Sequence, residues 1–241
     1  MLRTIAWYTH FAVSLLLKTP EMFRVKKMIK DGKNPEAIEY IEKTTRRWAL
    51  SQMKLSGARV KIYGEENIPK DVPVLFIGNH QSNFDIALFL SYIKKPKGYI
   101  AKAEMKSWPL VHTWMEFIDC VFMDRSNIRK SAEAIVQGVN ILKSGHSLVI
   151  FPEGTRSKGD KLGDFKAGSF KLATKAKVAI IPVTISGSYK LMEQNGNKIK
   201  PADVELHIHP MIETKDLSKE ELDGLPKKVK NIIESKLPNI S

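Results

Sequence analysis

Hydrophobic positions recur at helical spacing in the first quarter of the chain and in short β-branched runs after it. Apolar residues over 36–56 follow a 3.6-residue period, which predicts a helix that Pro35 opens and Gly57 ends. An apolar helix is predicted before it, starting near Thr4 and interrupted at Gly32. Residues 1–57 are therefore expected to form an N-terminal two-helix extension.

The pattern beyond residue 58 predicts an α/β domain over 58–241. Apolar runs predict strands at 59–63, 74–77, 99–101, 121–123, 147–151, 180–185 and 204–208. Helical patterns lie between several of them, at 84–93, 107–117, 131–143 and 168–175, and a short helix is predicted at 226–237. Strands that alternate with helices of this length favour a largely parallel or mixed central sheet flanked by helices.

Composition excludes several classes of protein. With 241 residues and 43% hydrophobic residues, the chain is long and apolar enough to fold around a core. The single cysteine, Cys120, excludes an internal disulfide and a multi-cysteine zinc site, which favours a reducing, cytosolic setting. The net charge is +13, and residues 1–60 carry more than half of it, with 12 Lys or Arg against 5 Asp or Glu. Such an excess predicts an anionic partner without choosing among nucleic acid, membrane and phosphorylated substrate.

The N-terminal segment favours a membrane surface as that partner. Residues 4–17 contain no charged side chain, but these 14 residues fall short of the ~20 that a membrane-spanning helix needs. No small-residue cleavage site follows, as a signal peptide would require. Aromatic and basic residues suit an interfacial helix on anionic lipid: Trp7, Tyr8, Phe11 and Trp48, with Arg3, Lys18, Arg24, Lys26, Lys27 and Lys30. We expect a peripheral or monotopic protein on the cytoplasmic face of the membrane; the alternative is a helix packed on the protein itself.

A polar loop after the strand at 74–77 carries the first candidate chemistry. His80 lies on the turn, and Asp85 lies in the first turn of the next helix. If the chain folds back there, the carboxylate can bind one imidazole nitrogen and make the other a general base for an alcohol. The alternative is a capped helix whose loop histidine has no role.

Two further strand ends carry cations suited to a phosphate. After the strand at 147–151, Glu153 and Gly154 precede Thr155 and Arg156, a hydroxyl and a forked donor group. Lys102 and Arg125 also follow strands. Other motifs fail: GDFKAGS at 163–169 has Ser where a P-loop needs Lys, no nucleophile elbow occurs, and no third metal ligand accompanies the alternating histidines at 207 and 209. We therefore expect no metal site.

Four segments together resemble the glycerolipid acyltransferases, the lysophosphatidic acid acyltransferase family. They are NHQSNFD at 79–85, FMDR at 122–125, FPEGTRS at 151–157 and IPV at 181–183, in the family's order. The resemblance implies that His80, held by Asp85, deprotonates the sn-2 hydroxyl of lysophosphatidic acid, which then attacks an acyl thioester directly. It also implies a phosphate site of Arg156, Lys102 and Arg125 with Gly154 and Thr155, in which Glu153 orients a cation.

The same resemblance implies no cofactor, with acyl-CoA or acyl carrier protein as co-substrate and phosphatidic acid as product. Three alternatives stay open. Glycerol-3-phosphate or another lysolipid could be the acceptor. A thioesterase-type hydrolase would use the same His and Asp without needing cations at strand ends. A nucleic-acid-binding module is disfavoured, because the aromatic residues accompany an apolar N-terminal stretch and not a basic face.

Overall fold

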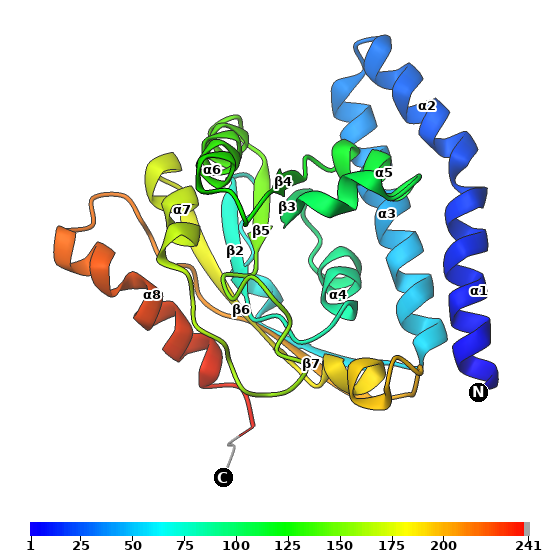
Figure 1. Cartoon of the computed structure of the whole chain (residues 1–241). Coiled ribbons are helices and arrows are strands. Elements are labelled where there is room, and N and C mark those ends of the chain that lie inside the picture. The colour runs from blue at the N-terminus through cyan, green and yellow to red at the C-terminus, as the bar shows by residue number, and fades with distance from the viewer. Residues whose placement is uncertain (239–241) are drawn as a thin grey trace.

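The computed structural model of the chain describes residues 1–238 and contains a seven-stranded sheet with helices on both faces (Figure 1). The strands are β1 (Arg59–Tyr63), β2 (Val74–Gly78), β3 (Lys97–Lys102), β4 (Val121–Met123), β5 (Ser147–Ile150), β6 (Ala179–Ser186) and β7 (Asp203–Ile208). The helices are α1 (Leu2–Leu17), α2 (Thr19–Lys30), α3 (Asn34–Ser56), α4 (Phe84–Tyr92), α5 (Val111–Phe117), α6 (Ile128–Lys143), α7 (Lys171–Ala176) and α8 (Lys219–Glu234). All seven predicted strands are confirmed.

The sheet is mixed, in the order β1-β7-β6-β2-β5-β3-β4. The five strands from β6 to β4 are parallel, and β7 pairs antiparallel with β6 while parallel with β1. The central strands β2 and β5 are buried along their whole length, as expected for parallel strands covered on both faces. This explains why their sequences are continuous apolar runs and not alternating ones.

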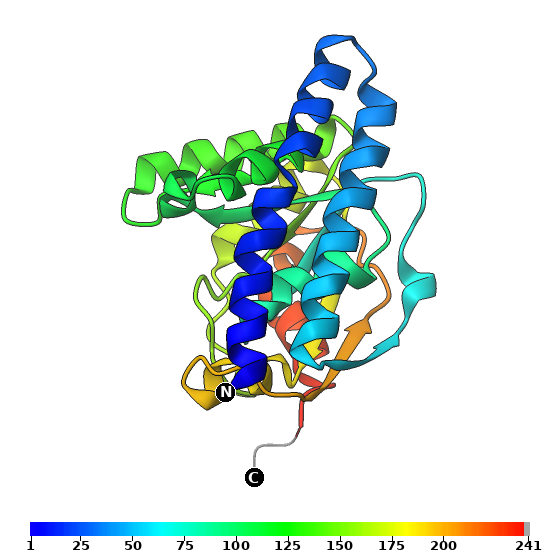
Figure 2. The same cartoon turned by 90° about the vertical axis from the view of Figure 1, so that its right-hand side faces the viewer.

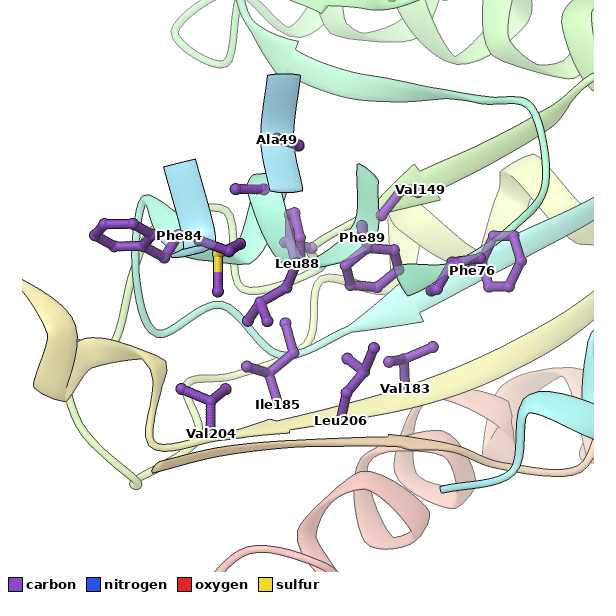
Figure 3. Packing of buried hydrophobic residues seen from close by; sticks show 14 of the residues in the cluster. Ala49, Phe76, Phe84, Leu88, Phe89, Val149, Val183, Ile185, Val204 and Leu206 are labelled. Carbon is purple, nitrogen blue, oxygen red and sulfur yellow. The ribbon is translucent and has the colours of Figure 1, made fainter. Parts of the chain in front are cut away.

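Alternate side chains of the strands enter two separate cores. Val74 and Phe76 of β2 pack toward α4, whereas Leu75 and Ile77 pack toward α6, α7 and α8. Figure 3 shows the first core, in which α4 residues lie between Ala49 of α3 and the side chains of β6 and β7. Helix α4, which carries the candidate carboxylate, is therefore held between the sheet and the N-terminal helices.

The N-terminal region consists of three helices and not two. Helix α1 ends at Leu17, and α2 begins at Thr19 with Pro20 in its first turn. Proline lacks the N–H that an uninterrupted helix would use and is favoured in a first helical turn, so a new helix starts there. Helix α3 then returns alongside α1 (Figure 2). No helix within residues 1–238 is long and apolar enough to cross a membrane.

The C-terminal helix begins seven residues before the predicted start at residue 226. Ser218 accepts a hydrogen bond from the Glu221 N–H, and the Glu221 carboxylate accepts one from the Ser218 N–H, which is a capping box. Pro226 lies inside α8 and does not open it. The helix starts earlier than predicted because the capping box of Ser218 and Glu221 is a stronger start signal than Pro226.

Candidate active site

Polar loops follow five neighbouring strands at one edge of the sheet. Because β6, β2, β5, β3 and β4 are parallel, their carboxyl ends all lie at this edge. His80 follows β2, Arg156 follows β5, Lys102 ends β3, Arg125 follows β4, and Ser188 follows β6. Ligands of open α/β sheets bind at the carboxyl ends of strands. The topology therefore places every predicted catalytic and phosphate-binding residue at the edge where a site is expected.

His80 and Asp85 form a hydrogen-bonded pair. The chain folds back between them, and His80 Nδ1 lies 2.7 Å from Asp85 Oδ2. Asp85 is fully buried, whereas 18% of the His80 side chain is exposed. An ionised carboxylate only accepts hydrogen bonds, so Nδ1 carries the proton and Nε2 keeps its lone pair. Within the described chain no group bonds Nε2, which is therefore free to accept a proton from an approaching hydroxyl.

Four donors fix the Asp85 carboxylate. Its Oδ2 accepts the N–H groups of Gln81 at 2.7 Å and Ser82 at 2.8 Å in addition to His80 Nδ1. Its Oδ1 accepts the hydroxyl of Ser188, which lies in a short 3-10 helix, Ser188–Leu191, directly after β6. Hydrogen bonds to a charged group are roughly twice as strong as neutral ones. The carboxylate is thus held in one orientation by the loop that carries His80, after β2, and by Ser188 at the end of β6.

The imidazole of His80 is also fixed from β5. Its ring stacks on Phe151, with ring centroids 4.3 Å apart and planes 15° from parallel. The His80 carbonyl accepts the Ser157 N–H at 2.7 Å. Because Phe151 and Ser157 are the first and last residues of the FPEGTRS segment, the two loops that the sequence identified are in contact.

Glu153 braces this arrangement and does not hold a cation, contrary to expectation. Its Oε1 accepts the His80 N–H at 2.7 Å, and its Oε2 accepts the Gly163 N–H at 2.7 Å. Burial raises the pKa of this carboxyl, while the two backbone N–H groups act in the opposite direction. With both oxygens used by the backbone, Glu153 joins the His80 turn to the loop after β5.

Arg156 forms an ion pair with a residue that the sequence analysis did not identify. Its Nη1 donates to Glu193 Oε1 at 2.8 Å, and the Glu193 side chain is only 2% exposed. Glu193 lies in the 3-10 helix Glu193–Asn195 and also accepts the Ser82 hydroxyl at 2.6 Å and the Asn83 N–H at 2.9 Å. Arg156 is therefore anchored beside the His80 loop through this carboxylate.

The other predicted phosphate-binding residues occupy different surroundings. Gly154 has a φ of +75°, and a Cβ built on it would lie 3.0 Å from both Arg125 Nη1 and Lys166 Nζ. Thr155 and Lys102 are exposed, and neither side chain has a hydrogen bond or ion pair within residues 1–238. The structure thus brings Arg125 to Gly154, together with Lys166, a cation absent from the prediction.

Ser188, Glu193 and Lys166 are the residues that sequence reasoning missed. Ser188 follows Gly187 at the end of a strand, which is the same signal that identified His80. Glu193 lies in a polar stretch with no motif, and its relation to Arg156 depends on the tertiary fold. Lys166 lies in the GDFKAGS segment, whose glycine spacing resembles a nucleotide-binding loop and gives no sign of a role for this lysine.

The predicted membrane-binding aromatic residues hold α1 onto the protein. Trp7 is only 8% exposed, its Nε1 donates to the Gln52 carbonyl at 3.1 Å, and its ring packs on Phe84. Phe11 stacks on Trp7 and meets Trp48 edge-on, while Trp48 Nε1 donates to Ser14 Oγ at 3.0 Å. Placing Trp7 at a bilayer was wrong, because this tryptophan satisfies its N–H and buries its ring inside the fold.

The exposed side of α1 and α2 carries other apolar side chains and basic residues instead. Tyr8 is partly exposed and donates to the Asn197 carbonyl, and Lys26 and Lys27 are exposed, the latter paired with Asp31 at 2.9 Å. Large apolar side chains also face solvent along the two helices: Leu2, Ile5, Val13, Leu16, Leu17 and Phe23. We call this set the apolar face of α1 and α2.

Comparison with known proteins agrees with this geometry. The family model described as Acyltransferase matches residues 59–186. A 1-acyl-sn-glycerol-3-phosphate acyltransferase of Borreliella burgdorferi is 33% identical over 186 residues, which are 77% of this chain and 74% of that protein. A probable 1-acyl-sn-glycerol-3-phosphate acyltransferase of Mycoplasma pneumoniae is 39% identical over 160 residues, 63% of this chain and 58% of its own length.

A solved structure extends the similarity to the N-terminal helices. The crystal structure of PlsC, the 1-acyl-sn-glycerophosphate acyltransferase of Thermotoga maritima, matches with a TM-score of 0.85 and 30% identity. The match covers 97% of this chain and 92% of that one. With half of the chain matched by the family model and its whole fold by PlsC, the protein is an enzyme that belongs to the acyltransferase family.

Proposed function

We propose that the enzyme transfers a fatty acyl group from an acyl thioester to the sn-2 hydroxyl of 1-acyl-glycerol-3-phosphate, forming phosphatidic acid for phospholipid synthesis. The observation that carries the proposal is the His80–Asp85 pair, whose free Nε2 lies at the strand edge that also carries Arg156 and the pair of Arg125 and Lys166. The names of the relatives support the same acceptor.

The reaction follows from the orientation of the imidazole. Nε2 of His80 takes the proton of the sn-2 hydroxyl while the oxygen attacks the thioester carbonyl. Asp85 stabilises the imidazolium through Nδ1. The tetrahedral intermediate then collapses, the C–S bond breaks, and His80 returns the proton to the leaving thiolate. A general base contributes ~10²–10⁴-fold, so positioning of the two substrates supplies the rest.

Cations at the same edge give the acceptor its phosphate site in this proposal. Arg156 follows β5 and is held by Glu193, and Arg125 follows β4 and approaches Gly154. A hydrolase would need neither, since water carries no phosphate. This requirement separates an acyltransferase from a thioesterase that uses the same His and Asp.

A matrix of donors and acceptors tests the proposal. Purified enzyme in vesicles is assayed for thiol release with acyl-CoA or acyl carrier protein as donor, against lysophosphatidic acid, glycerol-3-phosphate, lysophosphatidylcholine or no acceptor. We expect release that depends on lysophosphatidic acid and is lost in His80→Ala, with an unchanged unfolding temperature. Release without any acceptor would establish the thioesterase alternative, and preference for glycerol-3-phosphate would move the proposal to that acceptor.

We also propose that the apolar face of α1 and α2 docks on the cytoplasmic face of an anionic membrane. Leu17 is 72% exposed and Phe23 67% exposed, and exposed cations accompany them on α2. Apolar side chains combined with nearby basic residues are typical of interfacial helices. The docking surface is therefore the outer side of the helices and not the aromatic residues that face the protein.

Vesicle sedimentation tests this docking. The triple variant Leu2→Ser, Leu17→Ser, Phe23→Ser is expected to bind phosphatidylglycerol vesicles at least tenfold more weakly, which requires a loss of about 1.4 kcal/mol. The matched control is Ile128→Ser with Val136→Ser, which removes exposed apolar side chains from α6. Equal binding by both variants and the wild type would contradict the proposal.

A further inference from the structure

Two cations from different segments converge on the backbone of Gly154. The point at which a residue-154 Cβ would stand lies 3.0 Å from Arg125 Nη1 and 3.0 Å from Lys166 Nζ, so the two nitrogens are at most about 6 Å apart. Arg125 follows β4, and Lys166 ends the long loop after β5. A side chain at residue 154 would fill the space between them, and the left-handed φ of +75° also favours glycine there.

Within residues 1–238, no carboxylate forms an ion pair with either cation. Neither Arg125 nor Lys166 has a side-chain hydrogen bond or a salt bridge to any residue of the 1–238 range. Burial lowers the pKa of Arg125, and Glu104 acts on it only through longer-range attraction. Two unpaired positive charges at this separation repel each other, and an anion between them removes that repulsion.

Arg156 differs from this pair because its charge is already matched. Its guanidinium is bonded to Glu193, which Ser82 and Asn83 hold in place. An anion at Arg156 shares the guanidinium with this buried carboxylate, which bonds Nη1. An anion at Arg125 and Lys166 meets no such carboxylate within residues 1–238.

The loop that carries Lys166 is built to hold it there. The Lys166 N–H donates to the Pro152 carbonyl at 3.1 Å, and Glu153 Oε2 accepts the Gly163 N–H at 2.7 Å. Both ends of the segment 163–166 are therefore tied to the turn that precedes Gly154. The other oxygen of Glu153 accepts the His80 N–H. Glu153 therefore positions both the loop that carries Lys166 and the turn that carries the proposed base.

We propose that Lys166 and Arg125 together bind the phosphate of the acceptor across Gly154, which makes Lys166 a substrate-binding residue. The inference rests on the proposed function, since it deepens the assignment of that same site. Charge-assisted hydrogen bonds have lengths of about 2.8 Å, so one phosphate can accept from two donors about 6 Å apart. The ligand chemistry is a phosphate monoester, which the acceptor lipid and the 3′-phosphate of coenzyme A both carry.

Kinetics of Lys166→Gln distinguish these two sources. The side chain is exposed, so the variant should fold, and Lys161→Gln in the same loop is the matched control. We expect the KM for lysophosphatidic acid to rise about tenfold or more, with the KM for acyl-CoA unchanged, and partial recovery in Lys166→Arg. Unchanged KM for the acceptor, or an equal rise for acyl-CoA, would overturn the proposal.

A binding measurement separates failure of this inference from failure of the proposed function. Calorimetric titration with glycerol-3-phosphate needs no turnover and is expected to give at least tenfold weaker binding in Lys166→Gln than in the wild type or Lys161→Gln. Equal affinity in all three proteins would overturn the role of Lys166. A wild type that binds this probe through Lys166 but does not acylate lysophosphatidic acid would refute the proposed function alone.

Discussion

Replacing Asp85 by Asn removes the negative charge of the side chain. The hydrogen-bond donors around residue 85 determine which way the new amide group points. Oδ2 of Asp85 accepts three N–H groups, from His80, Gln81 and Ser82. An Asn that turned its NH₂ toward them would face three donors. Its carbonyl oxygen must therefore take this position, which leaves the NH₂ for the Ser188 hydroxyl oxygen.

The expected loss of activity in Asp85→Asn follows from that orientation of the amide. The imidazole keeps its proton on Nδ1, so His80 remains a base with the correct tautomer. Exchanging a charged acceptor, with hydrogen bonds of about 1.5–3 kcal/mol, for a neutral one, with about 0.5–1.5 kcal/mol, costs the imidazolium about 1–1.5 kcal/mol. We expect kcat to fall about tenfold. Where an Asp-to-Asn change reverses the tautomer, as in the serine-protease triad, the loss is about 10⁴-fold.

Thiol release at saturating substrate, compared across Asp85→Asn, Asp85→Ala and His80→Ala, measures these losses. Asp85→Ala removes both charge and orientation, so its activity should fall by ~10²–10⁴-fold, close to that of His80→Ala. Thermal unfolding of each variant controls for loss of structure. A 10³-fold loss in a folded Asp85→Asn would refute the orientation argument, and wild-type turnover in all three variants would refute general-base catalysis by this pair.

Three other predictions concern groups near and far from the site. Arg156→Ala should raise the KM for the phosphorylated acceptor more than that for the thioester, and equal effects would argue against a phosphate role. Glu193→Ala leaves three donors without their acceptor and should lower the free energy of unfolding by about 2 kcal/mol or more, whereas Glu193→Gln, which keeps the shape, should recover most of it in urea titrations. The pKa of His209 is lowered to about 4, mainly by burial and to a smaller extent by the positive charges of His207 and Lys236. The unfolded chain takes up this proton near pH 6.5, so stability present at pH 7 should fall by roughly 2 kcal/mol at pH 5, and a His209→Gln variant without this pH dependence would confirm the source.

The sequence predicted the sheet and its functional edge because both depend on local patterns. Continuous apolar runs such as 74–77 identify strands buried on both faces, and the polar residues after them mark the carboxyl ends. His80 and Asp85 could be paired in advance because both belong to one loop and the helix it enters. Ser188 is more than 100 residues away from Asp85 in sequence, and only the pairing of β6 with β2 brings it close.

The errors have a common physical origin in tertiary packing. Tryptophan is a residue type typical of membrane interfaces. In this fold, however, the Trp7 ring packs on Phe84 of α4, so it is buried against protein and not in lipid. A glutamate carboxylate can bind a cation, but both oxygens of Glu153 accept backbone N–H groups, from His80 and Gly163. The roles of Glu193 and Lys166 could not be predicted from the sequence. No local pattern distinguishes a buried carboxylate, or a lysine directed at a particular loop, from a charged side chain in solvent.

The contact between Trp7 and Phe84 has a consequence for how the enzyme would meet its substrate. Phe84 is the first residue of α4 and immediately precedes Asp85, so α1 contacts the chain one residue away from the His80–Asp85 pair. This contact therefore joins the proposed docking helix to the helix that holds the proposed base. In the docked enzyme, the depth of α1 in the lipid headgroups would set the height of His80 above the bilayer. The reach of the imidazole into the leaflet could then be tuned by substitutions on the outer side of α1, without altering any residue at the strand edge.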